Sequence, residues 1–328
     1  MWGGVPVDLS GRFVRFAEKE CKGSSPLYEK WSKEVAKDRQ LLDLASNAGE
    51  GQPVPNLFFG AVQYLLLKEK EDGILGADFK RFKEFCIENK SEISRLLKTK
   101  RVQTNEIRRC AYLYPVFCSI FQQTAKPLSL IEIGTSAGLQ LHWDRYSYEY
   151  GDGYTYGKAD SSVRIRSEFK GKPVLLPESP PVVSRVGVDL YVNDVRKEED
   201  RMWLKALIWP EHEERRVLFE EAARVMKKDP VQLIEGDGVS LLPELAEKTE
   251  RDSTLVVFHT HVANQMPVNV KEQLEKNIHL ISGWRDVFHV YNNMWDGLLH
   301  VDSIIDGIEE KNTIGRTEGH GQWFEWNL

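Results

Sequence analysis

The chain has 328 residues, of which 41% are hydrophobic and 29% are charged, and its formal net charge is −6. This composition is typical of a folded protein with a sizeable core, and the length is enough for one large or two ordinary domains. The acidic balance gives no electrostatic reason to expect nucleic-acid binding.

No segment is expected to direct the chain to a membrane or out of the cell. Uncharged apolar runs stay well short of the roughly 20 residues that a membrane helix needs, and the N-terminus lacks a secretory signal pattern. The four cysteines have no C-x-x-C spacing, which favours reduced structural thiols. We therefore expect a cytoplasmic protein with no membrane partner.

The first third of the chain reads as one helix after another, and no persuasive strand precedes Leu128. The pattern of apolar residues predicts helices over 56–67, 79–97 and 106–123. The sequence thus predicts an all-helical N-terminal domain over residues 1–125.

From residue 126 onward, short apolar strands alternate with helices. Strands are predicted over 128–133, 182–190, 231–234, 254–258, 287–292 and 321–326. Helices are predicted over 198–207, 213–228 and 269–282, with a short one after Pro243. This alternation predicts an α/β domain over 126–328, with a mainly parallel, doubly wound sheet covered by helices on both faces. Alternating tyrosines from Tyr146 to Tyr156 predict an aromatic hairpin, inserted at about residues 145–175, that serves either as packing or as a stacking surface for a planar substrate.

The segment from Leu128 to Leu139 reads as a buried strand, a glycine-bearing turn and the start of a helix. In a nucleotide-type site, Gly134 and Gly138 let the backbone approach a ligand, and the helix start offers free N–H groups. The same letters, from Gly134 through Thr135 and Ser136 to Gly138, also spell G-x-S-x-G, the elbow that exposes a nucleophilic serine in hydrolases.

Acidic residues follow three of the predicted strands: Glu132, Asp189 and Asp237. In a doubly wound sheet, ligands bind at the carboxyl ends of the strands, where the strand order reverses. A single aspartate there is more often a turn former or a helix cap. The three together favour an adenosine-containing ligand, with Asp189 on a ribose diol and Asp237 on an adenine amino group.

Two other chemistries fit the sequence less well. A hydrolase needs an oxyanion loop and sheet strands before the elbow, and neither is predicted, although Asp237, His259, His261 and His320 lie downstream and leave this alternative open. A dinucleotide dehydrogenase is disfavoured because Ser136 replaces the second glycine of G-x-G-x-x-G. A carboxylate at Glu132 also suits the positively charged methionine end of S-adenosylmethionine better than a pyrophosphate.

With these residues, the sequence resembles class I S-adenosylmethionine-dependent methyltransferases over about residues 126–328. Their first motif, acid-x-Gly-x-Gly-x-Gly, stands here as Glu132-Ile-Gly-Thr-Ser-Ala-Gly138 and departs from the family at Ser136. The resemblance implies a Rossmann-like methyltransferase fold with S-adenosylmethionine as cofactor. The cofactor-binding residues that it implies are Glu132, Gly134, Thr135, Ser136, Gly138, Asp189 and Asp237.

A closer likeness, to the bacterial family called domain of unknown function 2332, covers nearly the whole chain. It rests on several separate segments, which are 55–65, 102–110, 132–139, 203–210 and 319–326. This likeness implies the methyltransferase-like fold and no particular substrate.

Candidate catalytic residues lie in two places. Asn105 and Glu106 either begin a helix or form a polar cluster over the cofactor. His259 and His261 follow the fourth predicted strand, where one of them would act as general base, unless both are structural. No nearby acid or cysteine completes a metal site with them, so no metal is expected.

The function predicted from the sequence is therefore methyl transfer from S-adenosylmethionine to a small molecule, by residues that include His259, His261, Glu106 and Asn105. The alternatives are a non-catalytic ligand-binding or sensor protein with the same fold, and a serine hydrolase that uses Ser136. The sequence defines neither the methyl acceptor nor the oligomeric state.

Overall fold

The computed structural model describes residues 8–70 and 78–328 and divides the chain into two compact units. Unit 1 comprises Met1–Thr104 and Lys197–Arg216, and unit 2 comprises Asn105–Arg196 and Val217–Leu328. This division differs from the single boundary expected at residue 125. The helix Cys110–Thr124 belongs to unit 2, and the later segment Lys197–Arg216 belongs to unit 1. Within the described residues, no helix combines the length and apolarity needed to cross a membrane.

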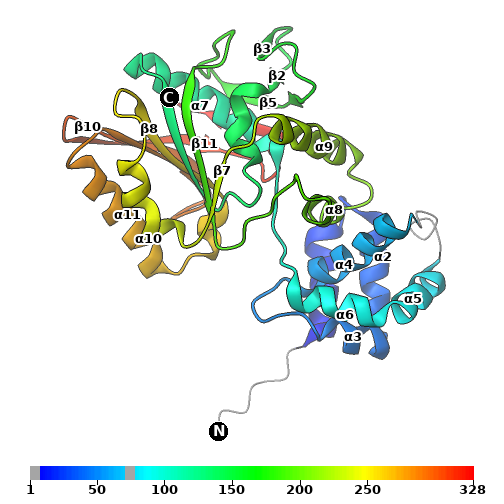
Figure 1. The fold of residues 1–328 in the computed structure, drawn as a ribbon. Coiled ribbons are helices and arrows are strands. Elements are labelled where there is room, and N and C mark those ends of the chain that lie inside the picture. The colour runs from blue at the N-terminus through cyan, green and yellow to red at the C-terminus, as the bar shows by residue number, and fades with distance from the viewer. Residues whose placement is uncertain (1–7, 71–77) are drawn as a thin grey trace. The chain divides into compact units, whose positions relative to one another are not determined.

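Unit 1 is helical, as predicted (Figure 1). Its helices are α1 (Leu9–Phe16), continued by the π-helical turn η1 (Ala17–Cys21), α2 (Pro26–Val35), α3 (Arg39–Ala45), α4 (Val54–Glu69), α5 (Phe79–Glu88), α6 (Lys90–Thr99) and α8 (Glu198–Ala206). The single helix predicted over 79–97 is two helices, α5 and α6. They separate at Asn89, whose side-chain amide donates to the Phe85 carbonyl and closes α5.

The strongly apolar helix α4 explains why a later segment joins unit 1. Its one buried amide side chain, Gln63, accepts from the Tyr28 hydroxyl at 2.5 Å and donates to the Ile208 carbonyl at 2.9 Å. A Cβ at Gly60 would lie 2.8 Å from the Leu207 side chain, so the absent side chain lets that residue approach the helix. Buried polar groups need such partners, and this one finds its acceptor about 145 residues further along the chain.

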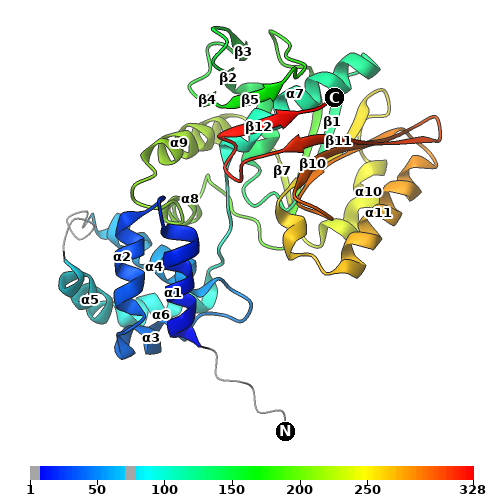
Figure 2. The same cartoon turned by 180° about the vertical axis from the view of Figure 1, so that it is seen from behind.

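Unit 2 contains a seven-stranded sheet with the order β11-β10-β9-β8-β1-β6-β7 (Figures 1 and 2). The strands are β1 (Leu128–Ile133), β6 (Val182–Asp189), β7 (Gln232–Glu235), β8 (Thr254–Thr260), β9 (Val287–Asn292), β10 (Leu298–Ile305) and β11 (Ile308–Arg316). Five neighbouring strands run parallel to one another, in the order β7, β6, β1, β8 and β9. Strand β10 is antiparallel to both of its neighbours, β9 and β11. The strand order reverses at β1, which has β6 on one side and β8 on the other. The mixed α/β class and the mostly parallel sheet are confirmed.

Helices α10 (Gly238–Glu247) and α11 (Val268–Ser282) cover one face of this sheet, and α7 (Cys110–Thr124) packs on the other (Figure 1). Strand residues alternate between the faces. On the α10–α11 face, Ile131 and Val257 belong to one apolar core cluster. On the α7 face, the ring of Phe258 contacts that of Phe117, with centroids 5.5 Å apart.

The predicted aromatic hairpin is confirmed as β2 (Ser147–Glu149) and β3 (Thr155–Gly157), in which Tyr148 is opposite Tyr156. Two further short strands of this region are β4 (Arg164–Arg166), beside β2, and β5 (Glu168–Gly171), which pairs with β12 (Trp323–Trp326). The hydroxyls of Tyr146 and Tyr148 are buried and donate to main-chain carbonyls. Packing therefore accounts for these two rings.

Three details of unit 2 differ from the prediction. The helix expected after Pro243 is α10, which begins earlier, at Gly238, and contains the proline. The helix expected to start at the end of the segment from Leu128 to Leu139 is a short 3-10 helix, η4 (Leu139–Arg145). The antiparallel hairpin β10–β11 was not predicted. The long helix α9 (Glu213–Lys228) has the predicted bounds.

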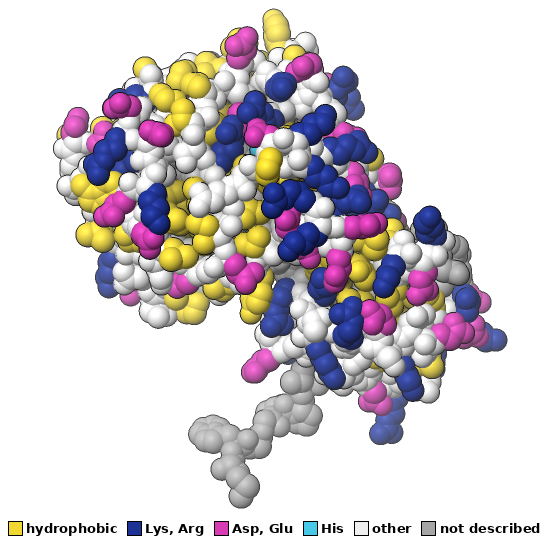
Figure 3. Space-filling model, in the orientation of Figure 1, with side chains coloured by type: hydrophobic (Ala, Val, Ile, Leu, Met, Phe, Trp, Pro, Cys, Tyr) yellow, Lys and Arg dark blue, Asp and Glu magenta, His cyan; other side chains and the backbone are white. Residues whose placement is uncertain are grey.

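Acidic and basic side chains both occur across the face drawn in Figure 3, with apolar ones between them. All four cysteines are buried and free.

Candidate functional site

Polar side chains gather on the α7 face at the carboxyl ends of the parallel strands. Glu132 and Asp189 lie at the ends of β1 and β6, on one side of the strand-order reversal, and Thr260 and Asn292 end β8 and β9. The edge where strand order reverses is where open α/β sheets bind ligands. All these residues belong to unit 2.

The turn after β1 needs glycine at two positions, but for a different reason than expected. Gly134 and Gly138 have φ angles of +75° and +69°, which favour glycine. A Cβ on Gly134 would lie 2.6 Å from Val262, and one on Gly138 would lie 2.7 Å from Leu233. Close packing against Val262 and Leu233 therefore accounts for the glycines at these two positions.

Ser136 ties this turn to its surroundings. Its backbone N–H donates to the Asp189 carboxylate at 2.8 Å, and its hydroxyl accepts from the amide of Asn105 at 2.9 Å and more weakly from that of Asn193 at 3.5 Å. The oxygen of Asn105 accepts from the Ala137 N–H at 3.3 Å. The predicted residues Asn105, Ser136 and Asp189 are thus brought together.

This geometry does not support a hydrolase. Ser136 has a positive φ of +51°, as a strained elbow would, and is 4% exposed. Within the described chain, its hydroxyl has hydrogen bonds with asparagine amides and none with a histidine or carboxylate. A nucleophilic serine requires a base to take its proton.

Glu132 is a buried carboxylate with one hydroxyl partner. It is 3% exposed and accepts from the Thr135 hydroxyl at 2.6 Å, and burial raises its pKa to about 8, with Thr135 opposing the rise. An acid with such a pKa is largely protonated at neutral pH. A cation beside it would stabilise the carboxylate and lower its pKa again.

Asp189 lies beside an exposed apolar surface. Its oxygens accept from the N–H groups of Ser136 and Tyr191, and burial raises its pKa. The next residues, Leu190 and Tyr191, are 63% and 50% exposed, which is unusual for large apolar side chains at a strand end. A carboxylate next to such a surface suits a ligand with hydroxyl groups and an apolar ring.

Asp237 has the structural role that an aspartate at a strand end usually has. It caps α10, with one oxygen accepting from the Val239 N–H and the other from the Ser240 hydroxyl at 2.6 Å, and the Ser240 bond lowers its pKa. Asp237 follows strand β7, which is adjacent to β6. Glu235, the last residue of β7, is paired with Asp189 of β6. Asp237 therefore lies at the same edge of the sheet as Asp189, but both of its carboxylate oxygens cap α10.

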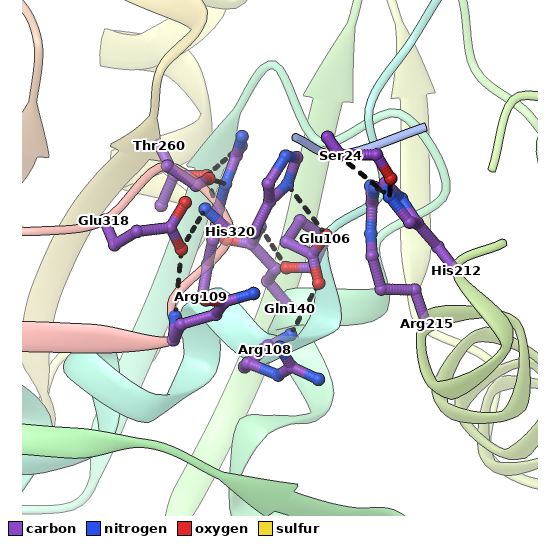
Figure 4. A network of polar contacts seen from close by, with 12 residues as sticks. Ser24, Glu106, Arg108, Arg109, Gln140, His212, Arg215, Thr260, Glu318 and His320 are labelled. Atoms are coloured by element: carbon purple, nitrogen blue, oxygen red, sulfur yellow. Dashed lines mark hydrogen bonds and ion pairs between the residues drawn. The ribbon is translucent and has the colours of Figure 1, made fainter. Parts of the chain in front are cut away.

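Glu106 belongs to a ring of hydrogen bonds at the end of β8, where Thr260 takes part (Figure 4). Its carbonyl accepts from the Gln140 side chain, whose oxygen accepts from the Thr260 hydroxyl at 3.1 Å. Arg109 then reaches Thr260 at 3.4 Å and donates to the Gly319 carbonyl at 3.0 Å. The ring closes where the Glu106 carboxylate meets His320 at 3.1 Å. Glu106 itself begins the short helix η3 (Ile107–Arg109), which leads into α7.

The two candidate histidines lie in different surroundings. His261 sits at the sheet edge in a left-handed conformation, between the side-chain amides of Asn292 and Asn293. Its pKa is lowered to about 3 by burial, Arg109 and His320. His259 points to the α10–α11 face, is 1% exposed and lies 3.2 Å from His289, and burial lowers its pKa to about 3. The contacts of His259 do not include the other predicted site residues.

Part of the cluster was not predicted from the sequence. Arg109, Gln140 and Thr260 were not selected as site residues, and His320 was only one of several histidines. The Gly-His-Gly turn at 319–321 was the available signal, because paired glycines often mark a close backbone approach. Within the described residues, no three His, Cys, Asp or Glu side chains are arranged to hold a metal ion.

Comparison with known proteins gives one match. The model of the family described as "Uncharacterized protein conserved in bacteria (DUF2332)" covers residues 10–326. No match was found among curated proteins or among solved structures.

Proposed function

The chain belongs to the bacterial family DUF2332, and we propose that it binds S-adenosylmethionine and transfers the methyl group to a small molecule. The observation that carries the proposal is the pair of acids at adjacent strand ends. Glu132 and Asp189 lie on β1 and β6 beside the strand-order reversal, and the Ser136 turn joins them.

The residues present fit this group at three points. Glu132, which is buried and keeps a raised pKa although Arg109 opposes the rise, would accept the ammonium of the methionine end. Asp189 would accept from the ribose hydroxyls, and the exposed Leu190 and Tyr191 offer an apolar surface for the adenine ring. Asn105 would hold the turn in place through Ser136.

S-adenosylmethionine supplies a methyl group on a sulfonium sulfur, which keeps the bonding electron pair when the methyl group is transferred. The protein has to align the acceptor with that group and exclude water. The hydrogen-bonded ring of Glu106, Gln140, Thr260 and Arg109 lies on the same α7 face as Glu132 and would face the acceptor.

Calorimetry with S-adenosylhomocysteine tests the proposal. Asp189→Asn should weaken binding at least tenfold, because the amide keeps the shape of the side chain and loses an acceptor for the ribose. Glu310→Gln is the control, since Glu310 is an exposed carboxylate on the edge strand β11. Its affinity should stay within twofold of the wild type.

Equal affinities in the two variants, or no binding by the wild type, would contradict the proposal. Consumption of labelled donor in the presence of a metabolite mixture then separates an enzyme from a protein that only binds the ligand.

A further inference from the structure

The turn Gly319-His320-Gly321 is pressed against the backbone at the start of α7. Gly321 has a φ of +76°, and a Cβ there would lie 2.5 Å from the Arg108 carbonyl oxygen. One oxygen of Glu318 accepts from the N–H groups of His320 and Gln322, at 2.9 and 3.1 Å. Only a residue without a side chain fits at position 321, so the glycine sets the position of the neighbouring histidine.

The His320 ring is oriented by a buried carboxylate. Its Nδ1 lies 3.1 Å from Glu106, whose side chain is 2% exposed, whereas the His320 side chain is 43% exposed (Figure 4). A carboxylate beside Nδ1 holds the ring proton there and leaves the lone pair on Nε2. Within the described chain, Nε2 has no hydrogen-bond partner.

The other described histidines on this sheet and on α11 lack that combination. On β10, His300 has its Nε2 2.9 Å from Asp296, but that carboxylate is 48% exposed, and the other ring nitrogen lies 3.4 Å from the Thr313 hydroxyl. His259 and His289 are paired with each other inside the protein, and His261 has amide donors at both ring nitrogens. His279 is exposed and lies 3.4 Å from Glu309, but that carboxylate is 40% exposed, and water screens its charge. A buried orienting acid together with an open ring nitrogen occurs at His320.

The dyad also adjoins the proposed cofactor turn. Asn105 and Glu106 are consecutive, so one residue bonds Ser136 and the next bonds His320. Gln140, which follows the turn, donates to the Glu106 carbonyl. Arg109 fixes the far side by donating to the Gly319 carbonyl.

We infer that His320 is the general base of the reaction and that Glu106 is the residue that positions it. The inference rests on the proposed function, and it gives His320 the role that the sequence predicted for His259 or His261. The acceptor would carry an O–H or N–H group. That bond breaks, its proton forms an N–H bond at Nε2 of His320, and its electron pair stays on the acceptor atom. The imidazolium that results is stabilised by the Glu106 carboxylate.

The dyad is tested first without cofactor or substrate. The full chain is treated with diethyl pyrocarbonate, and acylation of each histidine is followed by peptide mass spectrometry across pH. The charged groups that face His320 are Glu106, Glu318 and Arg109, and the titratable His261 also lies nearby. Glu106→Gln should slow acylation of His320 at least fivefold, because the ring loses its orienting charge. Glu309→Gln, the exposed counterpart, should change acylation of His279 less than twofold.

Nitrogen-15 spectra of labelled histidine give a second measurement, with His320→Gln used to assign the signals. The neutral ring should carry its proton on Nδ1. A proton on Nε2, or an acylation rate that is unchanged in Glu106→Gln, would overturn the dyad.

The catalytic role is tested in the same variants. His320→Gln should bind S-adenosylhomocysteine within twofold of the wild type and lose at least 100-fold in methyl transfer. Unchanged transfer would overturn the role of His320. A wild-type protein that does not bind S-adenosylhomocysteine would instead refute the proposed function, while the acylation and tautomer results would still decide the dyad.

Discussion

The two faces of the central sheet use the same strands for different purposes. On the α10–α11 face, Ile131 and Val257 are fully buried in an apolar cluster, and His259 is enclosed beside them. On the α7 face, the adjacent residues Glu132 and Phe258 lead to a polar sheet edge. One step along a strand changes a residue from core to candidate site. Mutations of neighbouring residues should therefore separate stability from ligand binding.

The largest expected loss of stability comes from a change in the apolar cluster. Ile131→Ala removes a fully buried side chain from the apolar cluster and should cost about 3 kcal/mol of unfolding free energy, as large-to-small core changes do. Chemical denaturation measures the cost. Affinity for S-adenosylhomocysteine in the folded variant should be unchanged, and a large loss of affinity would contradict the separation of the faces.

Replacement of the next residue, Glu132, should raise the free energy of unfolding rather than lower it, by an amount that depends on pH. The raised pKa of Glu132, about 8 against an ordinary 4.5, means that the folded state binds its proton more tightly than the unfolded state. The carboxyl therefore costs stability progressively as pH rises through that window. Glu132→Gln should match the wild type near pH 4 and exceed its unfolding free energy by roughly 5 kcal/mol above pH 8.

Denaturation of both proteins across pH measures this difference, and the histidines that they share cancel in the comparison. A constant difference at all pH values would show that Glu132 is not buried in its neutral form. The variant should also lose affinity for S-adenosylhomocysteine, in contrast to Ile131→Ala.

A smaller loss of stability is expected from a change at Gly134, in the turn after β1. Gly134→Ala places a Cβ against Val262 and should cost about 2 kcal/mol, from a clash added to an unfavourable φ. Gly153→Ala is the control, because its φ is +85° and no atom lies within 4 Å of the added Cβ. It should cost about 1 kcal/mol by thermal denaturation. Equal costs would show that packing against Val262 is unimportant.

The sequence predicted the parallel strands well, because their apolar runs are short and bounded by turn residues. Strands β1 and β9 and helix α9 have the predicted bounds. The hairpin β10–β11 was missed because its edge strand carries exposed charges such as Glu310 and Lys311. The turn Asp306-Gly307, with φ angles of +49° and +76°, was the signal that predicts it.

The site was predictable only in part. Glu132, Ser136 and Asp189 follow from the motif at the strand ends, and the structure brings them together. The face of His259 was not predictable, because every position of β8 from Thr254 to His259 is buried and no polar alternation marks the two sides. The pairing of Glu106 with His320 joins positions more than 200 residues apart, which no local pattern reveals.

The return of the segment Lys197–Arg216 to the helical unit has a consequence for synthesis and dissection of the chain. Unit 1 is discontinuous, since Gln63 finds its acceptor at Ile208 and the indole of Trp203 donates to the Arg101 carbonyl. On the ribosome, this unit stays incomplete until residue 216 has emerged, by which time β1 and β6 have also been made. A fragment that ends at residue 104 would lack part of the core of unit 1. The remaining fragment would contain α8 without the helices that it packs against, and Trp203 would be exposed.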